Sequence, residues 1–129
     1  MADFNEKINE LNNTKDTTAE FDQADIENNK IMGILAYISF LVLVPILAAK
    51  DSKFARFHAN QGLVLLIASI ASGIIIGALG ILPLIGWIFS IVGAVVEIAT
   101  VIFMVLGIVN AAQGRAKELP VIGGIKILK

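Results

Sequence analysis

The chain has 129 residues, of which 57% are hydrophobic and 16% are charged, and it contains no cysteine. Soluble domains usually carry about 25% charged residues, so this composition predicts a membrane protein. The missing cysteines exclude disulfide frameworks, thiol catalysis and cysteine-ligated metal sites. The formal net charge of -1 conceals an asymmetry, because residues 1–30 hold eight acidic against three basic residues and residues 110–129 hold four basic against one acidic residue.

The amino-terminal residues 1–23 are polar and acidic, with too few apolar side chains to build a core. We expect a flexible tail there. Asp22, followed three residues later by Asp25, resembles a helix-capping arrangement and predicts that the first helix begins near residue 23. A membrane domain is expected from residue 24 to residue 114.

The first apolar run, residues 31–49, has 19 residues and would span about 28 Å as a helix, close to the ~30 Å hydrocarbon core of a bilayer. It predicts the first membrane crossing. Pro45 lies inside this run, where it removes a backbone donor, so a kink is expected near the carboxyl end of the helix.

Residues 50–61 form the one strongly polar stretch within the apolar part of the chain. Asp51 or Ser52 could cap a new helix there, and the stretch reads as an interfacial turn that leads into the second crossing. Within it, His58 could sense pH at the interface, although such a residue is more often a simple interfacial side chain.

The second crossing is expected over residues 62–79, where Ser69, Gly73 and Gly77 recur at four-residue spacing. Small residues at this spacing let a second helix approach closely in lipid, so they predict a helix-packing face. Gly80 and Gly86 bracket Pro83 in a predicted turn.

The third crossing is expected over residues 87–109, with Glu97 near its middle. Glu97 shares one face with Ser90 and Gly93, and that face should look into the bundle. At the same depth, three hydroxyls are the expected partners of the carboxyl group: Ser39, Ser69 and Ser72. A protonated structural carboxyl is favoured over an ion or proton path, since no second ionisable group lies within the spans.

Residues 115–129 are predicted to leave the third helix near Gly114 and to lie on the membrane surface as a basic interfacial tail. Its cationic residues are expected to contact anionic headgroups; they are Arg115, Lys117, Lys126 and Lys129.

Three crossings would put the amino end and the turn at 80–86 on one face, and the turn at 50–61 and the carboxyl tail on the other. The positive-inside rule then places the amino end outside and the carboxyl end in the cytoplasm of a bacterium, as a multi-pass protein of the cytoplasmic membrane. The expected fold class is all-α, an integral membrane protein with three transmembrane helices.

Catalytic and ligand-binding motifs are missing from the sequence. One histidine cannot form a zinc or haem cluster, and no phosphate-binding loop or nucleophile elbow occurs. Basic residues are too few to argue for nucleic-acid binding. We therefore expect no enzyme, no cofactor and no metal, and the lipid bilayer as the principal partner.

Two segments, residues 34–67 and 107–128, resemble small bacterial membrane proteins of unknown function that are grouped with the chloroplast inner-envelope protein-import component. The most specific part is the block from residue 54 to residue 61, including the interfacial residues Arg56, Phe57, His58, Asn60 and Gln61. The resemblance implies a membrane domain of three or four helices and no catalytic residue. Some relatives carry soluble modules before the first helix, which would suit a cytoplasmic amino end.

The leading functional hypothesis is a non-enzymatic integral membrane protein that packs through its helices with itself or with a membrane partner. One alternative is a pore or conduit former, either holin-like or a small protein-translocation component. Another alternative is an immunity or stress protein that shields the membrane. All three share the same sequence features.

Overall fold

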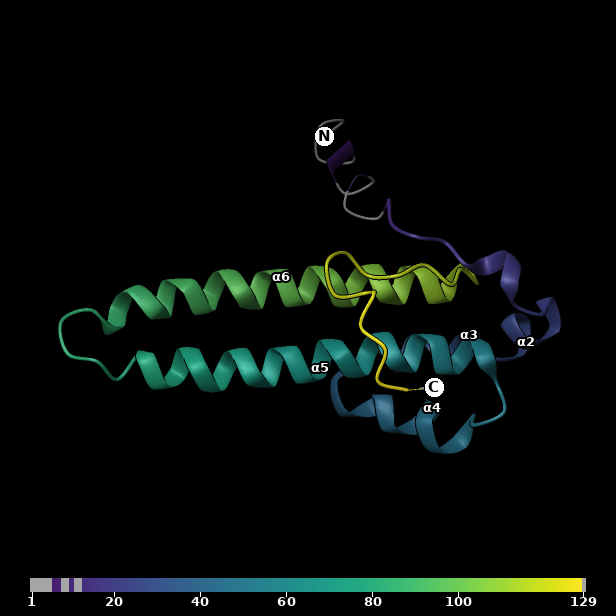
Figure 1. The fold of residues 1–129 in the computed structure, drawn as a ribbon, viewed down its shortest axis with the longest axis horizontal. Coiled ribbons are helices and arrows are strands. Elements are labelled where there is room, and N and C mark those ends of the chain that lie inside the picture. Colours follow the sequence, from purple (N-terminus) through teal and green to yellow (C-terminus); the bar gives the residue numbers. More distant parts are fainter. Residues whose placement is uncertain (1–5, 8–9, 11–12, 129) are drawn as a thin grey trace.

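The computed structural model of the chain describes residues 6–7, 10 and 13–128. Over these residues the fold is helical, as predicted, with one isolated bridge between Asp16 and Lys117. Its two longest helices are α5 (Lys53–Leu79) and α6 (Gly86–Ala112), which run antiparallel as a long hairpin (Figure 1). Within the described residues, they are the two helices long and apolar enough to cross a bilayer.

The predicted first span, residues 31–49, is broken into short segments. These are α3 (Lys30–Leu35), the 3-10 turn η2 (Ser39–Val42) and α4 (Leu43–Ala48). The chain reverses at Ser39, which has a positive φ of 48°, and α4 runs back alongside α3 (Figure 1). We call this unit, residues 30–48, the re-entrant hairpin.

The two ends of the re-entrant hairpin meet at one end of the molecule. Asp25, in the short helix α2 (Gln23–Asn28) that precedes it, accepts a hydrogen bond of 2.9 Å from the backbone N–H of Phe54, at the start of α5. The re-entrant hairpin therefore begins and ends at the same end of the molecule. Among the described residues, two helices are long and apolar enough to cross a bilayer, whereas the sequence predicted three crossings.

Pro45 does not kink a helix, contrary to the prediction. It is the third residue of α4, and in the first turn of a helix the missing N–H would have had no partner. The break in the chain lies earlier, at Ser39, where the backbone itself turns.

Local capping signals set two helix boundaries, the start of α5 and the end of α6. The Ser52 side chain accepts a hydrogen bond of 3.0 Å from the N–H of Ala55 and so caps α5, as predicted. Helix α2 begins at Gln23, as expected, although Asp22 makes no side-chain cap. After α6, Gly114 has a φ of 72°, a left-handed conformation that suits glycine and ends the helix at the predicted place.

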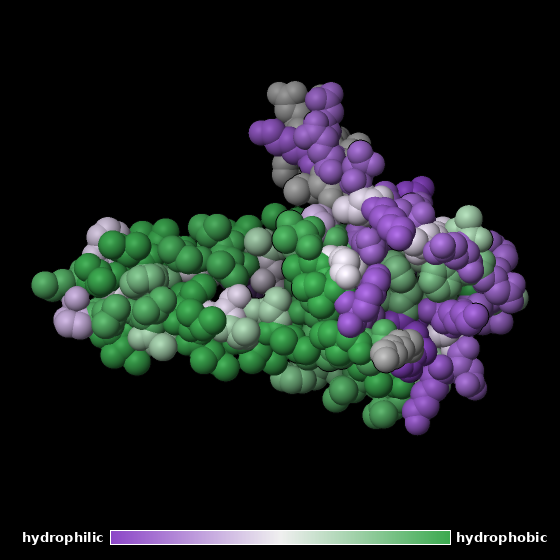
Figure 2. All heavy atoms as spheres, viewed as in Figure 1, coloured by the Kyte–Doolittle hydropathy of each residue, from purple (hydrophilic) through white to green (hydrophobic). Residues whose placement is uncertain are grey.

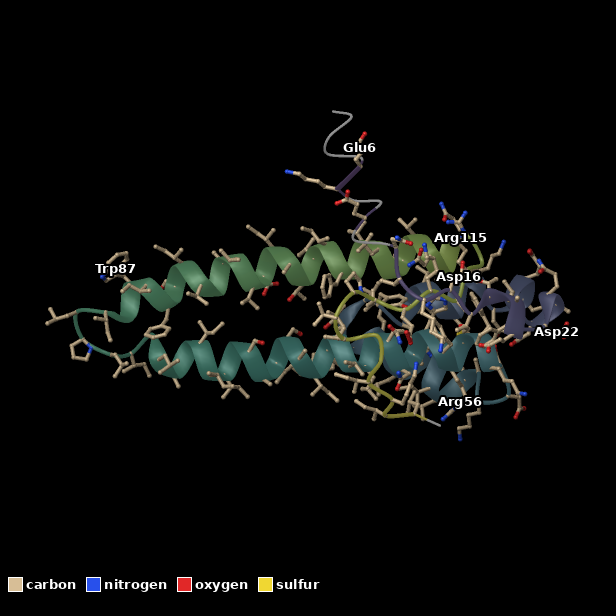
Figure 3. The ribbon with its side chains drawn as sticks, turned by 45° about the horizontal axis from the view of Figure 1, so that its top comes forward. Glu6, Asp16, Asp22, Arg56, Trp87 and Arg115 are labelled. Atoms are coloured by element: carbon tan, nitrogen blue, oxygen red, sulfur yellow. The ribbon has the colours of Figure 1, made fainter. Side chains whose placement is uncertain are left out.

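The molecule has an apolar end and a polar end. Figure 2 shows hydrophobic surface over the part of the α5–α6 hairpin distant from the chain ends, and hydrophilic surface at the opposite end. We call residues 66–105, which include the turn between α5 and α6, the shaft, and the rest of the described chain the head. Trp87 lies at the tip of the shaft, whereas Arg56 and Arg115 lie in the head (Figure 3).

The buried core lies in the head, where the re-entrant hairpin packs on α5 and α6. The closest approach is at Gly62, where an added Cβ would lie only 1.7 Å from the carbonyl oxygen of Ala36. Backbone therefore meets backbone at this point. The segment before α3, the turn at 50–52 and the carboxyl-terminal segment all belong to the head, so the predicted separation of amino end and residue 50 onto opposite faces is wrong.

Candidate functional site

The most specific part of the sequence, residues 54–61, forms the first turns of α5 and is largely buried in the head. Three polar side chains of this block are almost fully buried: His58, Asn60 and Gln61. Buried polar groups are costly unless they are hydrogen-bonded, so the partners of these side chains explain how the head is held together.

His58 joins the re-entrant hairpin to the carboxyl-terminal segment. Its Nδ1 lies 2.6 Å from the hydroxyl of Tyr37, and its Nε2 lies 2.8 Å from the carbonyl oxygen of Arg115. A carbonyl only accepts, so Nε2 carries the proton, and the Tyr37 hydroxyl donates to Nδ1 of a neutral ring. The rings of Phe54 and Phe57 contact His58 edge-on. The sequence placed His58 at an open interface; the structure encloses it.

Asn60 and Gln61 hold the carboxyl-terminal segment through its backbone. Asn60 donates to the carbonyl of Ile125 (2.8 Å) and accepts from the N–H groups of Ile127 and Leu128 (2.6 and 2.9 Å). Gln61 donates to the carbonyl of Gly123 at 3.0 Å and accepts from the Leu119 N–H at 2.8 Å. The two amides thus replace the strand or helix partners that this irregular segment lacks.

The basic residues of the predicted tail are distributed over this docked segment. Lys126 forms an ion pair with Glu118 at 3.2 Å. The backbones of Lys117 and Asp16 form an isolated antiparallel β-bridge, so the amino-terminal segment also lies against the tail. Hydrogen bonds from the side chain and the N–H of Thr18 lower the pKa of Asp16. Lys129 lies outside the described residues.

The structure brings only some of the predicted hydroxyl partners close to Glu97. Glu97, Ser39 and Ser69 line one cavity of about 380 Å³ beside the tip of the re-entrant hairpin, whereas Ser72 lines a different one. The Ser69 hydroxyl donates to the carbonyl of Leu66 instead of to the carboxylate. Over the residues that the structure describes, Glu97 has neither a hydrogen-bond nor an ion-pair partner.

The two small-residue faces meet across a second cavity. Gly73 and Gly77 of α5, with Ser90 and Gly93 of α6, line a space of about 460 Å³ that also reaches Glu97. An added Cβ at Gly73 or Gly77 would meet no atom within 4 Å. The predicted packing face on α5 is therefore left open in the single chain.

Two buried contributors to the head were not singled out from the sequence. They are Asn110, near the end of α6, and Tyr37, in the re-entrant hairpin, and both are almost fully buried. A polar residue one turn before the terminating Gly114 was the available signal for Asn110. In residues 6–7, 10 and 13–128, no three His, Asp or Glu side chains lie close enough together to hold a metal ion.

Comparison with known proteins identifies the family. Residues 28–128 match the MamF/MmsF family, described as a magnetosome magnetite crystal formation protein family. The chain belongs to the MamF/MmsF family. The match covers the residues of the re-entrant hairpin, the shaft and the docked carboxyl-terminal segment.

Individual relatives of the MamF/MmsF family agree with this assignment. Magnetosome protein MmsF of Paramagnetospirillum magneticum is 34% identical over 74% of this chain and 82% of its own length, and magnetosome protein MamF of the same organism is 33% identical over 72% and 78%. The UPF0132 membrane protein MJ1527 of Methanocaldococcus jannaschii is 32% identical over 72% of this chain, but the alignment spans only 64% of that relative. No solved structure shows a significant match.

The resemblance to a chloroplast import component is wrong, because the MamF/MmsF match covers both segments on which it rested. Apolar helices with scattered small residues look alike in unrelated membrane proteins, since lipid restricts their composition. The block at residues 54–61 serves instead to hold the head of a MamF/MmsF domain together.

Proposed function

We propose that the protein is a non-enzymatic integral membrane protein that assembles with copies of itself through the shaft. The proposal depends on one observation, that Glu97, in the middle of an apolar helix, has no partner among the described residues. The carboxyl group lies about ten residues, or ~15 Å, from Trp87 at the tip of the shaft, and therefore near the bilayer midplane. It has no partner within the described chain, and an unpaired polar group in lipid is costly.

A second copy suits this face because the face is self-complementary. It carries an acceptor, Glu97, and the hydroxyl of Ser90 on one helix, beside the open glycines of α5. In a two-fold contact, each group of one copy meets the corresponding face of the other, so a hydroxyl can reach the opposing carboxyl group. Close approach at glycine faces favours such packing in lipid.

Membrane orientation is part of the proposal. All ten Lys and Arg residues lie before residue 57 or after residue 114, whereas the turn between α5 and α6 has none. Arg56 of the first group and Arg115 of the last group lie in the head, at the end away from Trp87 (Figure 3). The positive-inside rule then supports a cytoplasmic head with a re-entrant hairpin and a shaft tip on the far side of the membrane.

The assembly can be tested with the double variant Gly73→Ile and Gly77→Ile in lipid nanodiscs or detergent. We expect cross-linking and energy transfer between labelled copies to fall sharply, because the branched side chains block close approach. The matched control is Ala71→Ile with Ala78→Ile, which places the same two isoleucines on α5 outside both cavities. If the glycine variant assembles as well as the wild type, the proposal is wrong.

Glu97 supplies an independent arm of the same test. Glu97→Gln retains hydrogen-bonding capacity and should assemble, whereas Glu97→Leu should assemble less well because it removes the polar contact at the midplane. Equal assembly of the two variants would show that the carboxyl group plays no part.

The family match supports a second candidate function, a part in magnetite crystal formation, which is what the family description states of its members. The matched residues 28–128 include nearly the whole described domain. Co-precipitation of iron salts with proteoliposomes tests it. Crystals of altered size or shape relative to empty liposomes would support this role, and identical crystals would speak against it.

A further inference from the structure

A basic cavity lies in the head beside the first turns of α5. Its volume is about 590 Å³, and its walls come from the turn before α5, from α5 and from the carboxyl-terminal segment. Four of its side chains are cationic and one is anionic: Lys50, Lys53, Arg56 and Lys126, against Asp51. Assembly through the shaft makes no use of this cavity.

Within the described chain, two of these four cations have no ion-pair partner. Lys126 is paired with Glu118 at 3.2 Å and lies 5.6 Å from the ring centroid of Phe57. Lys50 and Lys53 are exposed and have no ion-pair partner among the residues that the structure describes. An anion that entered the cavity would therefore meet uncompensated positive charge.

Other side chains that line the cavity are fixed by contacts within the protein itself. Asn60 is fixed by its three hydrogen bonds to the backbone of residues 125–128, and Phe57 packs edge-on against Phe21, with ring centroids 5.7 Å apart. Phe57 and Leu128 add apolar surface to the lining. The cavity thus offers preorganised cationic and apolar walls together, which suits an amphiphilic anion.

The cavity begins at the depth of lipid headgroups, near Asn60, and extends to the water side of that layer, where its lysines lie. The apolar part of α5 begins at Gly62; Asn60 precedes it by about 3 Å along the helix and Arg56 by about 9 Å. The headgroup layer on each side of a bilayer is roughly 5–8 Å thick. In Figure 3, Arg56 lies in the head, at the end away from Trp87.

We propose that this cavity binds the phosphate group of an anionic phospholipid. Arg56 offers a planar fork that can bind two phosphate oxygens, and Lys50 and Lys53 act as point charges beside it. Phe57 and Leu128 then contact the apolar part of the same lipid molecule. A bound lipid would link the turn before α5 to the carboxyl-terminal segment, both of which line the cavity.

The test is native mass spectrometry of the full chain released from detergent, with either phosphatidylglycerol or phosphatidylcholine supplied. We expect the wild-type protein to retain phosphatidylglycerol and not phosphatidylcholine. The double variant Lys50→Gln and Lys53→Gln should bind phosphatidylglycerol about thirty-fold more weakly, as expected for two lysines near a lipid surface. Equal retention of both lipids by the wild-type protein would overturn the proposal without any variant.

The matched control is Lys7→Gln with Lys15→Gln, which removes the same charge from residues that do not line the cavity. This control variant should bind phosphatidylglycerol as tightly as the wild type does. If both double variants bind it equally weakly, the lipid responds only to the total charge of the protein, and the proposed site is wrong. Inorganic phosphate serves as the competing probe. If it displaces phosphatidylglycerol at comparable concentration, the ligand is a soluble phosphate and the lipid assignment is wrong.

Discussion

The hydroxyl of Tyr37 lies 2.6 Å from Nδ1 of His58, and both side chains are buried. This contact joins the tip side of the re-entrant hairpin to α5. Because Nε2 of the same ring is bonded to the carbonyl of Arg115, three segments distant in sequence meet at one imidazole. His58 is therefore a structural centre of the head.

Replacement of Tyr37 by Phe should destabilise the head. The ring volume is kept, but Nδ1 of His58 loses its donor and stays buried, which costs about 1–3 kcal/mol. Thermal unfolding in detergent, followed by circular dichroism, should show a lower melting temperature. Phe40→Leu is the control, because Phe40 is 66% exposed and its change should leave the melting temperature unaltered. Identical melting of Tyr37→Phe and wild type would contradict the assigned hydrogen bond.

Replacement of Asn60 by Ala should release the end of the carboxyl-terminal segment. Three hydrogen bonds to the backbone of residues 125–128 are lost at once, while α5 gains a good helix former. Limited trypsin digestion should then cleave after Lys126 several times faster than in the wild type. Ser72→Ala, in the shaft, should leave the cleavage rate unchanged; protection of Lys126 in the Asn60 variant would refute the docking role.

Gly62 should tolerate no side chain, whereas Gly77 should tolerate one. A Cβ at Gly62 would lie 1.7 Å from the carbonyl oxygen of Ala36, so Gly62→Ala must push the re-entrant hairpin away from α5 and cost several kcal/mol. At Gly77 a Cβ would meet nothing within 4 Å. Melting temperatures of the two alanine variants, measured side by side, check this difference. Similar values would show that the hairpin does not pack on α5 at this point.

The re-entrant hairpin predicts a labelling pattern that three crossings cannot produce. Single cysteines at positions 15, 52, 83 and 118 in this cysteine-free chain can be treated with an impermeant maleimide in intact cells. Position 83 lies in the turn between α5 and α6, whereas position 52 precedes α5 and positions 15 and 118 are joined by a backbone hydrogen bond of 3.0 Å. We expect labelling from outside at position 83 alone. Joint labelling at 15 and 83, without 52 and 118, would restore a third crossing.

The sequence by itself determined the membrane character of the chain, the α5–α6 hairpin and several helix boundaries. These features depend on local properties: the length of an apolar run, a serine before the first N–H groups of α5, and a glycine able to adopt positive φ after α6. The sequence also singled out the block at residues 54–61, but it assigned this block to the wrong family and did not show what its side chains bind.

Only the tertiary structure showed that residues 31–49 fold back on themselves. A run of 19 apolar residues meets the length requirement of a crossing whether it crosses or folds back. What turns it back is the contact of Tyr37 with His58 and of Ala36 with Gly62, between residues more than twenty positions apart. Those contacts depend on packing in three dimensions, which no periodicity or composition within the run encodes.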